Sequence, residues 1–304
     1  MGREQPEYPT PLIKARDLEF LPKLSNKFLK YEGANPTGTQ KDRIAILHVR
    51  NAIQQGFKEI TVGTCGNYGA AIAYWAGKYG LKSKIFIPRG FHPTRLLQLR
   101  CDGLEVIRDD GFVEDMIERS RILASVNGYY DANPGSANRC LDELGYSEIS
   151  RETVQQLGCE PASVIVPVGN GTTLHGIYTG FKELRKEGKI DLMPRIVGVA
   201  PREANPIVDS VLSGKPYKDL DPRSVRVTAA NEPLAGYRSI DGEDAVKAIV
   251  ESSGFAVSIS DCEMISASSS FSKSTGIDIL PGSASVLVAL KRFANDLLDE
   301  GPIV

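Results

Sequence analysis

Short, continuous apolar segments alternate with longer amphipathic segments along most of this chain of 304 residues. The clearest apolar segments are KEITVGT (58–64), SKIFIP (83–88), LEVIRD (104–109), SVIVPV (163–168) and RIVGVA (195–200). Strands of this kind, buried on both faces, are typical of a parallel sheet that is covered by helices on each side. The pattern therefore predicts an α/β fold.

The segments between these strands have the spacing of amphipathic helices, and two of them end at Gly56 and Gly80. The predicted helices cover residues 43–55, 67–79, 93–101, 112–126 and about 172–186. Three stretches rich in turn-forming residues interrupt the pattern, at 131–139, 213–224 and 229–244. We expect the first to be a crossing between two lobes and the other two to be irregular loops.

The charge balance argues against several classes of partner. Lys and Arg number 36 against 38 Asp and Glu, which leaves a net charge of −2 and no electrostatic reason to bind nucleic acid or an anionic membrane. No apolar run has the length of a membrane span, and the start is too polar for a secretory signal. The cysteines at 65, 101, 140, 159 and 262 form no C-x-x-C pair, so we expect neither a disulfide framework nor a zinc knuckle. These features favour a cytoplasmic protein.

Nucleotide-binding and histidine-based sites are disfavoured by their missing signatures. The glycines of GNGTTLHG (169–176) do not have the G-x-G-x-x-G spacing, and the next strand ends in Val199-Ala200 without an acidic residue for a ribose. The chain has no P-loop motif and only three histidines, at 48, 92 and 175. We interpret His48 and His175 as packing or surface residues.

The segment KYEGANPTGTQKDR (30–43) places a lysine at the start of a predicted helix, after a Pro-Thr-Gly turn. A lysine that loses water against a folded loop has a lowered pKa and is a competent amine for a Schiff base. The same residues are also compatible with Lys41 and Asp42 as surface charges at a helix start. The segment alone leaves both interpretations open.

Two strand ends run into turns that open helices, at VGTCGNYGAA (62–71) and VPVGNGTTLHG (166–176). Helix N-termini present unpaired N–H groups, so each turn is able to hold a carboxylate or a phosphate. Asn67 can bond a ligand's hydroxyl or phenolate oxygen, or act as a helix N-cap. The hydroxyls of Thr172 and Thr173 can face a phosphate, although a simple helix cap is the plainer interpretation.

Together, the three segments resemble the β-family (fold type II) of pyridoxal-phosphate enzymes, which includes tryptophan synthase β-subunits, cysteine synthases, threonine dehydratases and threonine synthases. N-P-T-G-T-Q-K-D-R is similar to the signature N-P-T-G-S-F-K-D-R of threonine synthases, T-C-G-N to the substrate loop S-[ST]-G-N, and G-N-G-T-T to the phosphate loop. PTPLI (9–13), VGVAPREANPI (197–207) and PGSAS (281–285) extend the resemblance over essentially the whole chain.

The resemblance implies two open parallel-sheet lobes of the tryptophan synthase β type. A smaller, substrate-contacting lobe would hold 45–138, and a larger lobe of 1–44 plus 139–304 would bind pyridoxal 5'-phosphate, with the cofactor between the lobes. Lys41 would carry the cofactor and move protons on the substrate, and Asn67 would lie beside the phenolic oxygen. The implied phosphate-binding residues are Gly169, Asn170, Gly171, Thr172 and Thr173. Ser283 is a candidate partner for the pyridine nitrogen, and the implied substrate-binding residues are Thr64, Cys65, Gly66, Asn67 and Arg139.

The activity implied is β- or γ-elimination or replacement on an amino acid, with a threonine synthase-like conversion of O-phosphohomoserine to threonine as the first candidate. Two departures keep other activities open. The stretch N-P-G-S-A-N-R puts Arg139 out of the register of the N-P-x-R that binds the substrate phosphate in threonine synthases, and L-P-G-S-A replaces their E-P-A-S-A. A cysteine or cysteate synthase-like enzyme, a serine or threonine dehydratase-like enzyme and a non-catalytic relative are the alternatives. We expect a homodimer that needs no metal.

Overall fold

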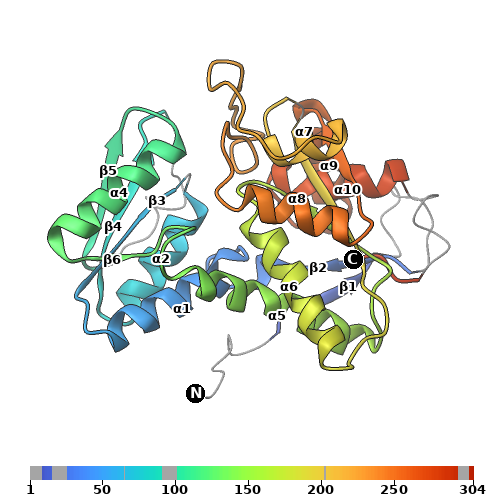
Figure 1. Ribbon diagram of the computed structural model, residues 1–304, viewed down its shortest axis with the longest axis horizontal. Helices are drawn as coiled ribbons and strands as arrows, with labels where there is room; N and C mark the ends of the chain where they lie inside the picture. The colour runs from blue at the N-terminus through green and yellow to red at the C-terminus, as the bar shows by residue number, and fades with distance from the viewer. Residues whose placement is uncertain (1–8, 16–25, 65, 91–100, 202, 294–300) are drawn as a thin grey trace. The chain divides into compact units, whose positions relative to one another are not determined.

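The computed structural model describes residues 9–15, 26–64, 66–90, 101–201, 203–293 and 301–304 (Figure 1). Within them, contacts divide the chain into two compact units. Unit 1 holds Glu32–Tyr146, and unit 2 holds Thr10–Tyr31 and Ser147–Val304. The smaller lobe expected at 45–138 lies within unit 1, which also includes residues 32–44 and 139–146.

Unit 1 is a parallel four-stranded sheet with helices on both faces. Its strands are β3 (Glu59–Gly63), β4 (Lys82–Pro88), β5 (Leu104–Asp109) and β6 (Tyr130–Asp131), in the order β5-β4-β3-β6. Its helical elements are η1 (Glu32–Ala34), α1 (Lys41–Gln54), α2 (Asn67–Lys78), α4 (Val113–Asn127) and the first part of α5 (Arg139–Leu157). Helix α2 connects β3 to β4 and α4 connects β5 to β6, so the two connections cross the sheet in opposite directions. Right-handed connections therefore place these two helices on opposite faces.

Unit 2 is built around three parallel strands, β7 (Ser163–Pro167), β8 (Arg195–Pro201) and β9 (Ala256–Ile259), in that order. The antiparallel pair β1 (Leu12–Lys14) and β2 (Phe28–Lys30) adjoins them, because Ile303 forms parallel bridges to both Lys27 and Ser163. The helices of unit 2 are the rest of α5, α6 (Thr172–Lys186), α7 (Pro206–Ser213), α8 (Gly242–Glu251), α9 (Asp261–Thr275) and α10 (Pro281–Phe293).

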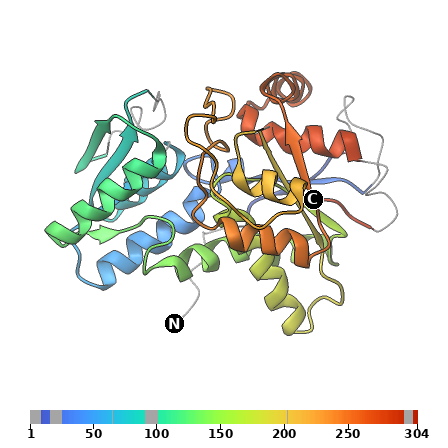
Figure 2. The same cartoon turned by 45° about the horizontal axis from the view of Figure 1, so that its top comes forward.

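Alternate residues of β8 face opposite layers of helices. Val197 and Val199 pack with Met264 of α9 and Ala289 of α10. Gly198, on the other face, lies against Leu174 of α6 and Ile249 of α8. Figure 2 shows the two layers, with the red helices on one side of the sheet and the orange and yellow-green ones on the other. Both faces of the central strand are buried, as its apolar sequence predicts.

The predicted fold class is confirmed, and the predicted strands match the observed ones to within a residue or two. The turn-rich stretches hold neither helix nor strand between Gly214 and Asp241. The helix predicted near 93–101 lies almost wholly outside the described residues.

Candidate functional site

The lysine segment of unit 1 folds into a turn that charged and polar side chains hold in place. Thr37 donates two hydrogen bonds to Asp42, from its backbone N–H and from its hydroxyl, each 2.8 Å long. The indole Nε1 of Trp75 donates to the other carboxylate oxygen of Asp42 at 2.7 Å. Arg43 binds Glu32 in a bidentate ion pair with contacts of 2.7 and 2.8 Å. Lys41, the first residue of α1, thus stands next to two anchored residues.

Asp42 and Arg43 are each only 2% exposed, so the interpretation of Asp42 as a surface charge is wrong. Burial raises the pKa of the Asp42 carboxyl, against the hydrogen bonds from Thr37 and Trp75, which act to lower it. A buried carboxylate that accepts three hydrogen bonds fixes the backbone around it. This fixed backbone determines where the Lys41 side chain starts.

The amine of Lys41 lies against a tyrosine that sequence reasoning did not identify. The Nζ atom donates to the Tyr146 hydroxyl at 3.1 Å, and it lies 5.5 Å from the centre of the Tyr146 ring. The two residues are 105 positions apart, and no local motif connects them. Only the fold of unit 1 brings them together.

The predicted substrate loop of unit 1 is a strand-to-helix turn. Thr64 is buried, and its hydroxyl accepts a hydrogen bond from the Gly66 N–H at 3.2 Å. Gly66 is the N-cap of α2, and Asn67 is the first residue of that helix rather than its cap. Cys65 lies outside the described residues. Arg139 is the first residue of α5, and its Nε lies 3.4 Å from Glu143 Oε1.

The predicted phosphate turn of unit 2 is held through its backbone. The Asn205 side-chain amide donates to three carbonyl oxygens, those of Val168, Gly169 and Leu234, at 3.0, 3.2 and 2.8 Å. Gly171 has a φ of 87°, and a Cβ added there would lie 2.8 Å from the Asp241 carbonyl oxygen and 2.9 Å from Ala245 Cβ. Only glycine fits this position without a rearrangement.

The residues of this turn fit a bound phosphate. Within the part of the chain that the structure describes, the first three amides of α6 have no hydrogen-bond partner. They form the positive end of a helix of 15 residues, which is a favourable environment for a dianion. The Thr172 hydroxyl is already used, because it donates to Asp241 at 2.6 Å, whereas Thr173 is only half-buried. Thr173 and the amides are thus better placed to hold a phosphate than the Thr172 hydroxyl.

Ser283 lies in the first turn of α10 and is exposed. A Cβ added at the neighbouring Gly282 would lie 3.4 Å from the Leu234 side chain. A Cβ added at Gly169 would lie 2.6 Å from the Pro233 carbonyl oxygen. The loop at 233–234 is therefore shared by the start of α10 and the phosphate turn. The structure brings these two predicted parts of the site to one loop of unit 2.

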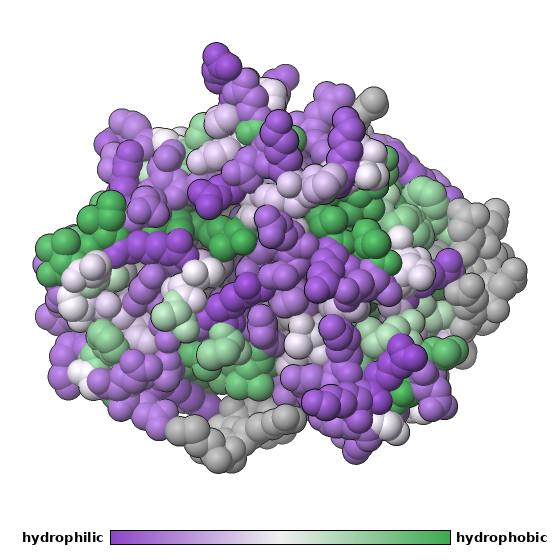
Figure 3. All heavy atoms as spheres, viewed as in Figure 1, coloured by the Kyte–Doolittle hydropathy of each residue, from purple (hydrophilic) through white to green (hydrophobic). Residues whose placement is uncertain are grey.

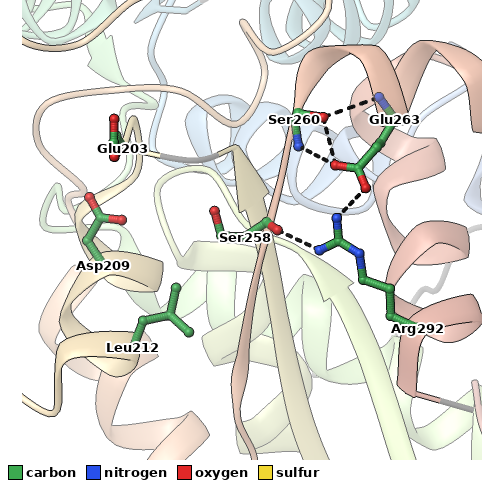
Figure 4. Close-up of a pocket in the computed structure, with 7 residues that line it drawn as sticks. All are labelled: Glu203, Asp209, Leu212, Ser258, Ser260, Glu263 and Arg292. Carbon is green, nitrogen blue, oxygen red and sulfur yellow. Dashed lines mark hydrogen bonds and ion pairs between the residues drawn. The ribbon is translucent and has the colours of Figure 1, made fainter.

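Unit 2 also has a separate pocket of about 530 Å³, at the carboxyl ends of β8 and β9 (Figure 4). It is lined by Glu203, Asp209, Leu212, Ser258, Ser260, Glu263 and Arg292, none of which is a predicted site residue. Glu263 pairs with Arg292 and accepts hydrogen bonds from the Ser260 hydroxyl and N–H at 2.7 and 3.0 Å. Burial and the nearby Glu203 raise the pKa of Asp209. This pocket therefore has an acidic lining.

One face of the surface, the described helices and the described side-chain clusters bear on membrane and metal binding. On the face drawn in Figure 3, hydrophilic and hydrophobic side chains are interspersed, and the hydrophilic ones cover most of the area. The described helices include none with both the length and the apolar character of a membrane span. In the same described residues, no three His, Cys, Asp or Glu side chains gather as metal ligands.

The sequence is similar to known proteins over almost its whole length. The family model described as "Pyridoxal-phosphate dependent enzyme" matches residues 3–304. The threonine synthase of Methanocaldococcus jannaschii is 33% identical over 296 residues, which cover 97% of this chain and 71% of that protein. The threonine synthase of Methanosarcina acetivorans is 30% identical over the same shares of the two chains.

Solved structures with the same fold are more distant in sequence. An L-serine ammonia-lyase from Rhizomucor miehei superimposes with a TM-score of 0.79 at 22% identity, covering 98% of this chain and 92% of that one. Maize serine racemase gives a TM-score of 0.79 at 20% identity, covering 97% and 86%. The fold, the matched family model and the similarity to threonine synthases agree. The chain therefore belongs to the family of pyridoxal-phosphate-dependent enzymes.

Proposed function

We propose that this enzyme catalyses elimination or replacement at the β- or γ-carbon of an amino acid, and that its reaction is the threonine synthase-like conversion of O-phosphohomoserine to threonine. The observation that carries the proposal is Lys41, which starts α1 in a turn held by Asp42 and Arg43. The threonine synthases that are 33% and 30% identical to this chain support the choice of substrate.

Pyridoxal phosphate, when bound, draws electrons away from the α-carbon of an amino acid. Lys41 would hold the cofactor through its amine and move protons at the substrate carbons. The amides at the start of α6, with Thr173, would bind the cofactor phosphate. Thr64, Gly66 and Asn67 would bind the substrate carboxylate at the start of α2. Asn67 would also face the phenolic oxygen of the cofactor.

A dehydratase-like or cysteine synthase-like reaction is the second candidate, and Arg139 is the observation that favours it. Arg139 follows N-P-G-S-A-N and is paired with Glu143, so it is not a free cation for a substrate phosphate. A substrate without a phosphate, such as serine, threonine or acetylserine, needs no such arginine. The two candidates therefore differ in whether a phosphorylated substrate is used.

Borohydride reduction of the cofactor-loaded protein, followed by peptide mapping, tests whether Lys41 carries the cofactor. We expect the label on Lys41 and none in a Lys41→Ala variant; a label on another lysine would refute the assignment. Phosphohomoserine, acetylserine, phosphoserine, serine and threonine, each added separately and followed by absorbance and product analysis, then identify the substrate. Cofactor binding without turnover of any of these would favour a non-catalytic relative. The expected homodimer stays a prediction, which analytical ultracentrifugation tests.

A further inference from the structure

Two helices of unit 1 are joined at three successive levels. Lys41 of α1 contacts Tyr146 of α5, and His48 of α1 contacts Asp142 of α5. Between these two contacts, a Cβ added at Gly145 would lie 2.9 Å from the Arg43 carbonyl oxygen. Residue numbers rise along one helix as they fall along the other, so the two helices are antiparallel over this contact. The absence of a side chain at Gly145 lets the α5 backbone come this close to α1.

The His48 end of this contact is a chain of hydrogen bonds in a fully buried place. A carboxylate accepts, so the His48 Nε2–H donates to Asp142 Oδ1 over 2.9 Å. The other nitrogen, Nδ1, shares a hydrogen bond of 3.2 Å with the Tyr130 hydroxyl, and Asn51 donates to that hydroxyl at 2.8 Å. His48 and Asp142 both have an exposed fraction of 0%. Asp142 is therefore fixed, and it lies one helical turn before Tyr146.

The Lys41 end of the contact differs from the His48 end, because Tyr146 is fixed whereas the Lys41 side chain is intrinsically flexible. Tyr146 has an exposed fraction of 0%, and its ring has no room to leave its place. The Lys41 side chain has four rotatable bonds and loses entropy when its amine is held. The 3.1 Å hydrogen bond to the hydroxyl and the ring centre 5.5 Å away hold the amine at this position.

We propose that Tyr146 is a positioning residue for the Lys41 amine, and that Gly145 and Asp142 place Tyr146 by fixing α5 on α1. The proposal rests on the proposed function, in which Lys41 carries the cofactor. The hydroxyl accepts a hydrogen bond from the ammonium group and keeps the amine in one orientation. Tyr146 itself transfers no group.

The test compares the reactivity of Lys41 in cofactor-free protein, so that it does not depend on activity. Acetic anhydride modifies only the neutral amine, and mass spectrometry of the Lys41 peptide gives the rate. We expect Tyr146→Phe to raise the acetylation rate of Lys41 about three- to tenfold at pH 8, because the net loss of one ordinary hydrogen bond, which frees the amine, has this size. An unchanged or lower rate would overturn the proposal.

Tyr178→Phe is the matched control, because it removes the hydroxyl of a buried tyrosine of unit 2 that bonds Glu251 and takes no part in the contact between α1 and α5. Its Lys41 rate should stay within about twofold of the original, and a rise equal to that of Tyr146→Phe would overturn the specific role of Tyr146. Gly145→Ala keeps the hydroxyl but adds a methyl group against Arg43, and we expect it to raise the rate as well. Circular dichroism checks that each variant is folded.

The same samples separate this proposal from the proposed function. If borohydride fails to fix pyridoxal phosphate to Lys41 in the unaltered protein, the proposed function fails, while the acetylation rates still report on Tyr146. If Lys41 is labelled but Tyr146→Phe acetylates like the original protein, only the role of Tyr146 fails.

Discussion

The two units hold their candidate binding residues in different ways. In unit 1, buried charges and side-chain hydrogen bonds fix the Lys41 turn, through Asp42, Arg43 and Glu32. In unit 2, crowded glycines and backbone carbonyls fix the phosphate turn, with Asn205 bonding three of those carbonyls. A reactive amine needs a fixed side chain, whereas a phosphate needs exposed N–H groups. The difference follows from what each part of the site would bind.

The largest effect is expected at Gly171, where the backbone is both left-handed and crowded. Gly171→Ala adds a methyl group 2.8 Å from the Asp241 carbonyl oxygen at a φ of 87°. Strain and overpacking together should lower the free energy of unfolding by about 4 kcal/mol. Urea denaturation of the cofactor-free protein measures this loss.

Gly188→Ala is the matched control for that variant. Gly188 follows the other end of α6, has a φ of 67° and has nothing within 4 Å of an added Cβ. It should cost only about 1 kcal/mol, which is the conformational part alone. Equal losses at the two glycines would show that crowding does not hold the phosphate turn.

The next effect is expected at Asp42, which holds the Lys41 turn. Asp42→Ala leaves the half-buried donors of Thr37 and the buried indole of Trp75 without their acceptor and should cost about 3 kcal/mol. Asp42→Asn keeps one acceptor oxygen and should cost about half as much. Urea denaturation measures both. If the alanine variant is as stable as the original protein, the turn is not held by this carboxylate.

Much of the fold could be predicted from local sequence, whereas the partners of the site residues could not. The predicted strand 163–168 matches β7 to within one residue, because a short apolar run carries its own signal. The lysine and the two turns are local motifs as well. The partners of the site residues are distant in sequence. Tyr146 contacts Lys41 across 105 residues, Asp142 contacts His48 across 94, and Asp241 contacts Thr172 across 69. The residues around each partner give no sequence signal of the contact. The contact between Asp42 and Trp75, which lies within unit 1, likewise joins residues 33 positions apart.

A pH-dependent effect is expected at Glu232, which precedes the loop shared by the phosphate turn and α10. Burial raises the pKa of Glu232 to about 7, above its value of about 4.3 in an unfolded chain. Its contribution to stability is therefore complete below about pH 4.3 and is lost as the pH rises through about 7. Glu232→Gln should thus leave stability unchanged near pH 4 and raise it by about 2 kcal/mol at pH 8.

Urea midpoints measured from pH 4 to pH 8 check this prediction. Glu118→Gln, at an exposed position of α4, is the control and should give a nearly constant difference from the original protein. A parallel pH profile for Glu232→Gln and the original protein would contradict the raised pKa.

The smallest effects separate the two threonines of the phosphate turn. Thr172→Val loses the buried hydrogen bond to Asp241 and should cost about 1 kcal/mol of stability. Thr173→Val should change stability by less than about 0.5 kcal/mol but weaken cofactor binding about tenfold, because its hydroxyl would bond the phosphate. Urea denaturation and cofactor titration of both variants decide this; the reverse pattern would exchange the two roles.

The bridge at Ile303 has a consequence for the order in which the protein can be made. Among the described residues, the bridge between the strand pair near residue 27 and the sheet at Ser163 is residue 303, whose side chain is 1% exposed. In unit 1, by contrast, the strands and helices that pack together have all been synthesised by residue 146, well before residue 303. The pair β1 and β2 can therefore join the main sheet only after residue 303 has been synthesised.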